Sequence, residues 1–190
     1  MKLALFDLDG TLLPTDSDHS FGEFMVAIGW ADGERWRARN QHFFEQYQAG
    51  TLVLAEYVDF ATSVWRGRPP GEAEAARQRF MREVIAPQIK PAAQALVQGH
   101  IAAGDMVAVV TATNEFVTRP IASAFGVETL LAVELARDAS GQVTGQIYGV
   151  PTFREGKVTR VDAWLAAQGR TFHDFDDVLF YSDSTNDLPL

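Results

Sequence analysis

The sequence predicts an α/β fold, a doubly wound parallel sheet interrupted by an all-helical segment. Short apolar runs alternate with stretches of helical periodicity along most of the chain, which is the pattern of a parallel sheet covered by helices. Residues 16–86 depart from this alternation, because they are rich in aromatic side chains and contain no strand pattern. We therefore expect residues 1–15 and 87–190 to form a core domain and residues 16–86 to form an inserted helical cap domain.

The first predicted strand ends in a pair of carboxylates. The apolar run Leu3–Phe6 is followed at once by Asp7-Leu8-Asp9-Gly10, and ligands of open α/β sheets bind outside the carboxyl ends of the strands. Two carboxylates held close together repel each other by about 4 kcal/mol at an effective dielectric of about 20, and a hard divalent cation such as Mg²⁺ offsets that repulsion. A lone Asp-x-Asp-Gly is more often a solvated turn, so the interpretation depends on partners further along the chain.

The aromatic residues of the inserted segment predict helices. Phe43, Tyr47 and Tyr57 recur at helical spacing, which indicates a small helical module with its own core. Aromatic side chains at this spacing belong to a core more often than to a binding site. We therefore interpret Trp36 and Trp65 as core residues and keep a binding role as the weaker alternative.

A hydroxyl group follows the second predicted strand, at residues 106–110. The run continues as Thr111, Ala112, Thr113 and Asn114, ahead of a helix predicted at 115–125. A hydroxyl at a strand end and the first amides of a helix can both donate to an anion, so we expect Thr111, with Ala112 beside it, to bind a negatively charged group. In the alternative interpretation Thr113 or Asn114 caps the helix, and the two interpretations are compatible at different residues.

Lys157 stands at an unfavourable position for helix stability. We expect a third strand at 130–135, a returning hairpin strand at 143–150 and then a helix that begins near Lys157 and ends at Ala167. A lysine in the first turn of a helix is opposed by the helix macrodipole. We therefore expect Lys157 to bind a ligand rather than to stabilise the helix.

The last apolar run ends in acids, as the first one does. Residues 178–181 are followed by Ser182-Asp183-Ser184-Thr185-Asn186-Asp187. In a Rossmann-like sheet with right-handed crossovers, the carboxyl ends of the parallel strands meet at one edge. The side chains that we expect to gather there are those of Asp7, Asp9, Thr111, Asp183 and Asp187.

Composition excludes several classes of protein. The chain is 47% hydrophobic and 22% charged, which is typical of a folded globular protein, and it has no cysteine for disulfides or thiolate chemistry. A net charge of −9 argues against nucleic acid as a partner, because that binding depends on Lys and Arg. No apolar run approaches the roughly 20 residues of a membrane span, and no cleavable signal precedes the first strand. We therefore expect a cytoplasmic protein with neither a nucleic-acid nor a membrane partner.

The motifs together resemble the haloacid dehalogenase (HAD) superfamily of phosphohydrolases. Asp7-Leu8-Asp9-Gly10-Thr11 matches its first and most specific motif, Thr111 its second, Lys157 its third, and Asp183 with Asp187 its fourth, in the family's order and over the whole chain. The insertion at 16–86 looks like the cap of the phosphoserine phosphatase-like branch. Ser182 departs from the family's usual glycine, and the family pattern leads us to expect further sequence after Leu190.

The resemblance implies a role for each motif residue. Asp7 would be the nucleophile and Asp9 the general acid and base. Mg²⁺ would be held by Asp7, the carbonyl of Asp9 and Asp183, with Asp187 in support. The residues implied in binding the phosphorylated substrate are Thr111, Ala112, Lys157 and Asn186 at the phosphoryl group and Asp16 at an amine, where Asp16 is shorter than the family's glutamate.

The function that these residues predict is hydrolysis of a small phosphorylated metabolite by a Mg²⁺-dependent phosphomonoesterase, through an aspartyl-phosphate. Phosphoserine, histidinol phosphate or another small ester are candidate substrates. The alternatives are a mutase that transfers the phosphoryl group and a non-catalytic phosphate-binding module, although binding alone does not require both Asp7 and Asp9. The sequence leaves the oligomeric state and the choice of ester open, because cap side chains set specificity in this architecture.

Overall fold

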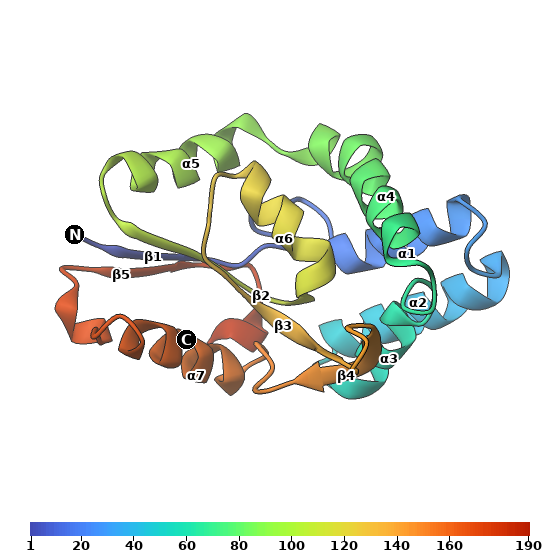
Figure 1. Cartoon of the computed structure of the whole chain (residues 1–190). Coiled ribbons are helices and arrows are strands. Elements are labelled where there is room, and N and C mark those ends of the chain that lie inside the picture. Colours follow the sequence, from blue (N-terminus) through green and yellow to red (C-terminus); the bar gives the residue numbers. More distant parts are fainter.

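A five-stranded sheet forms the centre of the computed structural model, which describes residues 1–190 (Figure 1). The strands are β1 (Leu3–Phe6), β2 (Met106–Asn114), β3 (Leu130–Arg137), β4 (Val143–Tyr148) and β5 (Val178–Tyr181). They lie in the order β4-β3-β2-β1-β5, with β4 antiparallel to β3 and the other pairs parallel. The predicted α/β fold with a mainly parallel sheet is confirmed.

Helices cover both faces of this sheet, as the doubly wound prediction requires. The covering helices are α5 (Pro91–Ala102) and α6 (Glu115–Ala124) on one face and α7 (Glu155–Ala166) on the other (Figure 1). Successive side chains of a strand point to opposite faces. Ala4 and Phe6 of β1 accordingly join a hydrophobic cluster with residues of α5 and α6, whereas Leu3 and Leu5 join a second cluster with residues of α7. β1, which lies between β2 and β5, is thus fully buried, and its carboxyl end is held firmly in place.

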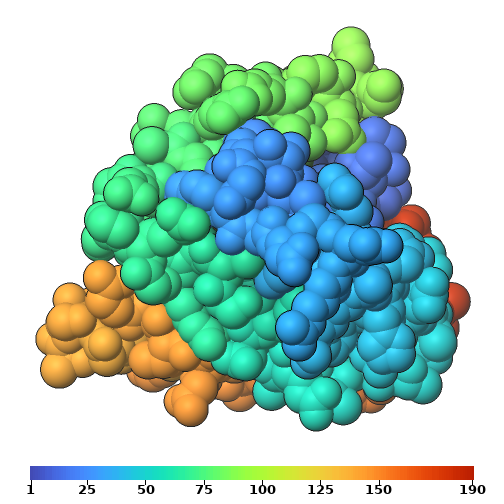
Figure 2. All heavy atoms as spheres, turned by 90° about the vertical axis from the view of Figure 1, so that its right-hand side faces the viewer, coloured from blue at the N-terminus to red at the C-terminus, as the bar shows by residue number.

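The segment between β1 and α5 is entirely helical, as predicted. It contains α1 (Ser17–Ala27), α2 (Gly33–Gln48), α3 (Leu54–Thr62) and α4 (Pro70–Phe80), followed by a π-helical turn (Met81–Ile85) and a 3₁₀ turn (Ala86–Gln88). Figure 2 shows the blue to green helices of this segment covering one side of the molecule, with the orange β4 region at its edge. None of the helices in the chain combines the length and apolar character needed to cross a membrane.

Three of the inserted helices share the main hydrophobic core. Phe21 and Phe24 of α1, Val58 of α3 and Phe80 of α4 belong to the same buried cluster as Phe6 of the sheet. The expectation that the inserted helices have a core of their own is therefore wrong for these residues, and most clearly for α1 and α4. Their apolar faces are buried against the layer that covers the sheet, which removes more apolar surface from water than a separate small module would.

Two tryptophans of the inserted segment, Trp36 and Trp65, pack against phenylalanines. Trp36 of α2 stacks on Phe60 of α3 with 3.9 Å between ring centroids, and Phe43 lies 5.1 Å from Phe60. Trp65 stacks on Phe116 of α6 with 4.0 Å between centroids. Both tryptophans are packing residues, as the helical spacing predicted.

We predict that Phe80→Ala destabilises the whole protein. Phe80 is fully buried, 5.0 Å from the ring of Phe21 and 5.6 Å from that of Phe24, so truncation leaves a cavity that costs about 3–5 kcal/mol of unfolding free energy. Urea unfolding followed by circular dichroism and by tryptophan fluorescence should show one shared, shifted transition. Leu96→Ala, at a side chain that is 39% exposed, is the control. Separate transitions for the two signals would contradict the shared core.

Candidate active site

An ion-paired lysine joins three segments at the end of β1. The Lys157 ammonium, in the first turn of α7, donates to Asp7 at 2.9 Å and to Asp187 at 2.7 Å. Lys157 is 1% exposed, Asp7 4% and Asp187 5%, so all three charges are withdrawn from water and depend on one another. The hydroxyl of Ser182 also donates to Asp187 at 2.7 Å. The structure therefore brings together the predicted residues of the first, third and fourth motifs.

The Asp7 carboxylate keeps one oxygen available to a ligand. Lys157 occupies Oδ1, whereas Oδ2 makes no hydrogen bond within the protein, and Asp7 lies in the wall of a cavity. Burial raises the pKa of Asp7 to about 7, the Asp187 charge adds to this rise, and the Lys157 ammonium opposes it. A carboxylate oxygen that lacks a partner in the protein and is accessible from a cavity has the surroundings of a nucleophile or of a cation ligand.

Asp9 is held in place by two donors. Its Oδ1 accepts from the amide of Ser17 at 2.7 Å, and its Oδ2 accepts from the hydroxyl of Thr113 at 2.8 Å. Burial raises the pKa of Asp9 to about 7, with a further rise from the charge of Asp16 and opposition from these hydrogen bonds. The orientation of Asp9 thus depends on the first turn of α1 and on the end of β2.

The turn after Asp9 lies against Asp183. Gly10 has a φ of +77°, and a Cβ at this residue would lie 2.1 Å from Asp183 Oδ2, so a glycine is required for both reasons. The hydroxyl of Thr11 donates to Asp183 Oδ1 at 3.3 Å and accepts from the Asp183 amide at 3.1 Å. The first and fourth motifs are therefore in direct contact through Asp183, which is itself exposed.

The end of β2 is irregular where it enters the site. Val110 pairs with Leu131 and Asn114 with Val133, so the four-residue step in β2 matches a two-residue step in β3. β2 therefore extends beyond its predicted end at residue 110, and the residues between are freed from the ladder, as bulges near active sites often are. Thr111 and Ala112 line the cavity, while Asn114 caps α6 by accepting from the Val117 amide at 3.3 Å. The capping interpretation is therefore confirmed for Asn114, whereas anion binding by Thr111 and Ala112 stays a prediction.

The cavity beside Asp7 is acidic and aromatic. Four carboxylates line it, those of Asp7, Asp9, Asp16 and Asp18, and no lysine or arginine does. Opposite them, on the inserted helices, lie Phe43, Phe44, Tyr47 and Tyr57. The cavity is thus formed between the carboxyl ends of the strands and α1–α3.

Asp16 and Asp18 occupy the start of α1. Asp16 is the N-cap and accepts from the His19 amide at 2.8 Å. Asp18 accepts from the side-chain amide of Asn114 at 3.2 Å and from the Tyr57 hydroxyl. Burial raises the pKa of Asp16 to about 6 and that of Asp18 to about 7, because neither carboxylate has a cationic partner in the protein.

Asn186 lies at the boundary between the core and the inserted helices. Its Oδ1 accepts from Arg154 Nε at 3.4 Å, and its Nδ2 donates to the carbonyl of Tyr47 at 3.5 Å. The predicted phosphoryl-binding group of Asn186 is thus engaged by these two neighbours and lies outside the Asp7-Lys157-Asp187 cluster.

Comparison with known proteins identifies the family. A sequence profile of haloacid dehalogenase-like hydrolases matches residues 4–190. The chain belongs to this family. A histidinol-phosphatase of Neisseria meningitidis serogroup C is 38% identical over 189 residues, which span 100% of this chain and 85% of that protein.

Solved structures of other proteins share the fold. A Bordetella pertussis protein of unknown function is 47% identical with a TM-score of 0.92, and the match covers 99% of this chain and 84% of that chain. A substrate-bound phosphoserine phosphatase is 18% identical with a TM-score of 0.67, covering 99% and 80% of the two chains. The resemblance to HAD hydrolases of the phosphoserine phosphatase-like branch is confirmed, and this chain is an enzyme of the phosphatase type.

The metal ligands implied for this HAD hydrolase are not gathered into one side-chain cluster. No three His, Cys, Asp or Glu side chains form a ready group of metal ligands. Asp187 is paired with Lys157, and the Asp9 side chain with Ser17 and Thr113. The free oxygen of Asp7 lies in the acidic cavity, and the exposed Asp183 lies in a neighbouring hollow that shares Asp9 with it. These two side chains and the Asp9 carbonyl are nevertheless hard oxygen donors, a set that fits Mg²⁺.

Several residues of the site carry no signal in a single sequence. Thr113 and Ser17 orient Asp9, Asp18 adds a fourth acid to the cavity, and Arg154 binds Asn186. The apolar run before Thr113 places it near a strand end, but the partner of its hydroxyl depends on where β1 lies. Asp18 stands in the first turn of a helix, where the macrodipole favours acidic residues, so its position alone does not indicate a role in the site.

We predict that Asp18→Asn stabilises this HAD hydrolase more at pH 8 than at pH 5. The pKa of Asp18 is 3.8 ordinarily and about 7 in the fold. Below pH 3.8 the group is protonated in both states, and above pH 7 the folded state holds a buried charge that the unfolded chain hydrates. Wild-type stability therefore falls as the pH rises between these values, by on the order of 4 kcal/mol.

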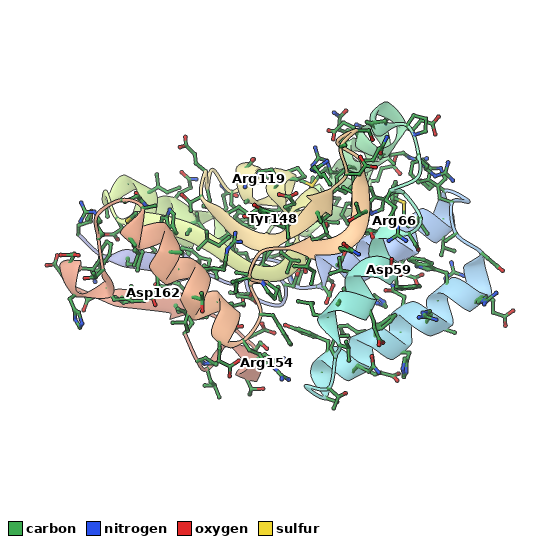
Figure 3. The ribbon with its side chains drawn as sticks, turned by 60° about the horizontal axis from the view of Figure 1, so that its bottom comes forward. Asp59, Arg66, Arg119, Tyr148, Arg154 and Asp162 are labelled. Carbon is green, nitrogen blue, oxygen red and sulfur yellow. The ribbon has the colours of Figure 1, made fainter.

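Urea unfolding at pH 5 and pH 8 measures the part of this fall that lies between pH 5 and the folded pKa of about 7, which is about 3 kcal/mol. Asparagine keeps an oxygen that can accept from Asn114 and Tyr57, so the variant isolates the charge. The control is Asp162→Asn, at an exposed position on α7 (Figure 3), which should change stability equally little at both pH values. An equal effect of Asp18→Asn at pH 5 and pH 8 would show that Asp18 is not a buried charge.

Proposed function

We propose that the chain is a Mg²⁺-dependent phosphomonoesterase that hydrolyses a small phosphorylated metabolite through an aspartyl-phosphate. The observation that carries the proposal is the placement of Asp7. One of its oxygens is fixed by the buried Lys157, the other is free at the cavity wall, and Asp9 is held beside the same cavity by Ser17 and Thr113. We also propose residues 16–86 as the cap domain of this enzyme, with residues 1–15 and 87–190 as its core.

The proposed reaction has two steps. In the first, the free oxygen of Asp7 forms a bond to phosphorus while the bond to the leaving alcohol oxygen breaks, and that oxygen takes a proton from Asp9. In the second, the Asp9 carboxylate takes a proton from water as the water oxygen attacks phosphorus. Inorganic phosphate leaves and the Asp7 carboxylate is restored.

Groups around Asp7 would stabilise the negative charge of the phosphoryl group. Thr111 and the freed backbone at Ala112 lie in the cavity wall, and the Lys157 ammonium lies directly behind the attacking carboxylate. When bound, Mg²⁺ would supply Lewis-acid stabilisation of the phosphoryl oxygens from Asp7, the Asp9 carbonyl and Asp183, with Asp187 in support. Without a cation, an anionic ester would meet three carboxylates that have no cationic partner in the protein, those of Asp9, Asp16 and Asp18, which supports the metal requirement.

The cavity favours an ester that carries a positive charge. Asp16 and Asp18 have no cationic partner in the protein, and the aromatic rings opposite them suit a flat or cationic group. Histidinol phosphate has an amine and an imidazole, and the 38% identical relative is named histidinol-phosphatase. We therefore propose a phosphorylated amino alcohol of this kind as the substrate, ahead of phosphoserine.

Asp7→Asn is predicted to abolish phosphate release while the fold remains intact. The amide has nearly the same shape as the carboxylate but is not a nucleophile. Release of inorganic phosphate from histidinol phosphate, phosphoserine and p-nitrophenyl phosphate is measured with Mg²⁺ and with chelator, and circular dichroism confirms folding. Wild-type turnover should require the metal. An active variant would remove Asp7 from the nucleophile role, and phosphoryl transfer without phosphate release would favour a mutase.

Asp16→Asn is predicted to raise KM for a cationic ester and leave KM for p-nitrophenyl phosphate nearly unchanged. Asparagine still caps α1, so only the charge is removed. Loss of one ion pair with the substrate should weaken binding by about tenfold, or about 1.4 kcal/mol. Asp32→Asn, at the exposed N-cap of α2, is the matched control. An equal rise for both esters would place Asp16 outside the recognition of the cation.

A further inference from the structure

Arg154 has an unusual backbone conformation at the start of α7. Its φ is +52° and its ψ is −124°, and no other non-glycine residue has a positive φ. Side chains with a Cβ rarely adopt this region, and such a conformation persists where the surrounding contacts hold it. The contacts of the Arg154 side chain therefore need an explanation.

Those contacts join the core to the inserted helices. The Arg154 guanidinium donates to the carbonyl of Gly50 and, at 3.4 Å, to Asn186 Oδ1. Asn186 in turn donates to the carbonyl of Tyr47 at 3.5 Å. We call Arg154, Asn186, Tyr47 and Gly50 the clasp. Figure 3 shows Arg154 between the salmon helix α7 and the cyan helices of the inserted segment.

The shape of the chain on the helical side matches this contact. Gly50 follows the end of α2 with a φ of +69°, and a Cβ there would lie 3.0 Å from Arg154 Nη2. The guanidinium thus lies so close to the backbone at Gly50 that a side chain at this position would crowd it. Phe153 adds a second contact, because its ring lies 4.9 Å from the Arg154 guanidinium and 6.4 Å from the Tyr47 ring.

The clasp is directly continuous with the reactive residues. The Lys157 amide donates to the Arg154 carbonyl at 2.9 Å, and Asp187 follows Asn186 in the chain. The two loops that the clasp ties to α2 are thus the ones that present Lys157 and Asp187 to Asp7. A shift of either loop would move the ion-paired cluster.

We propose that Arg154 is a positioning residue that holds the end of α2 against these two loops and so closes the cavity over Asp7. It touches none of the reacting atoms and acts through Asn186, Lys157 and the inserted helices. The kinetic part of this inference rests on the proposed phosphatase function, whereas the structural part is independent of it.

Hydrogen exchange tests the structural part. Arg154→Ala removes the guanidinium and keeps the backbone strain, Arg154→Gly removes the guanidinium and relieves the strain, and Arg160→Ala removes a different arginine of α7 that pairs with Glu134. We expect faster amide exchange at residues 47–53 in both Arg154 variants and wild-type exchange in the control. Unchanged exchange in Arg154→Ala and Arg154→Gly would overturn the clasp, whether or not the protein is active.

Steady-state kinetics on the ester that wild type hydrolyses fastest test the positioning role. Both Arg154 variants should lose about 10- to 100-fold in kcat/KM, as for a displacement of about 1 Å at a reacting centre. The loss should be the same in Arg154→Gly even if its melting temperature exceeds that of Arg154→Ala, and Arg154→Lys should recover part of it. Activity that follows melting temperature, or faster exchange with unchanged kcat/KM, would overturn the role.

Discussion

The site depends on one buried ammonium group. Lys157 is enclosed with Asp7 and Asp187, and each charge is tolerable in the interior only because the others are within hydrogen-bond distance. The three residues come from α7, from the end of β1 and from the turn after β5. This ion-paired cluster therefore fixes the relative position of three segments as well as the orientation of the Asp7 carboxylate. The two buried carboxylates need a cationic partner, which explains why a lysine stands in the first turn of α7, where the macrodipole opposes it.

The rest of the cavity has the opposite electrostatic character. Asp18 is buried and Asp9 and Asp16 are half-buried, with hydrogen bonds from amides and hydroxyls but with no cation, so withdrawal from water raises the pKa of each. A fold that keeps such uncompensated acids gives up stability at neutral pH. The same acids make the cavity attractive to cations, which is consistent with a metal ion at one end and a positively charged substrate group at the other.

The inserted helices are bound to the core in two different ways. On one side Phe21, Phe24 and Phe80 extend the hydrophobic cluster that covers the sheet, so this contact is mainly apolar. On the other side Arg154 and Asn186 reach α2 through hydrogen bonds to backbone carbonyls. Apolar packing of the first kind is close-packed and rigid, whereas a few half-buried polar contacts open more readily. The contacts between α2 and the core are therefore the ones that separate more easily.

The sequence by itself determined the mainly parallel sheet, the order of the motif residues along the chain and the family. Asp7, Thr111, Lys157 and Asp187 each stand beside a strand end or a helix start that local pattern reveals, because hydrophobic periodicity and strand length are local properties. Only the tertiary structure decided the partner of Thr113, the fourth acid Asp18 and the contacts of Arg154, since each joins segments far apart in the chain. Only the tertiary structure decided that α1 and α4 share the core of the sheet, because an apolar helix face does not indicate which surface will cover it.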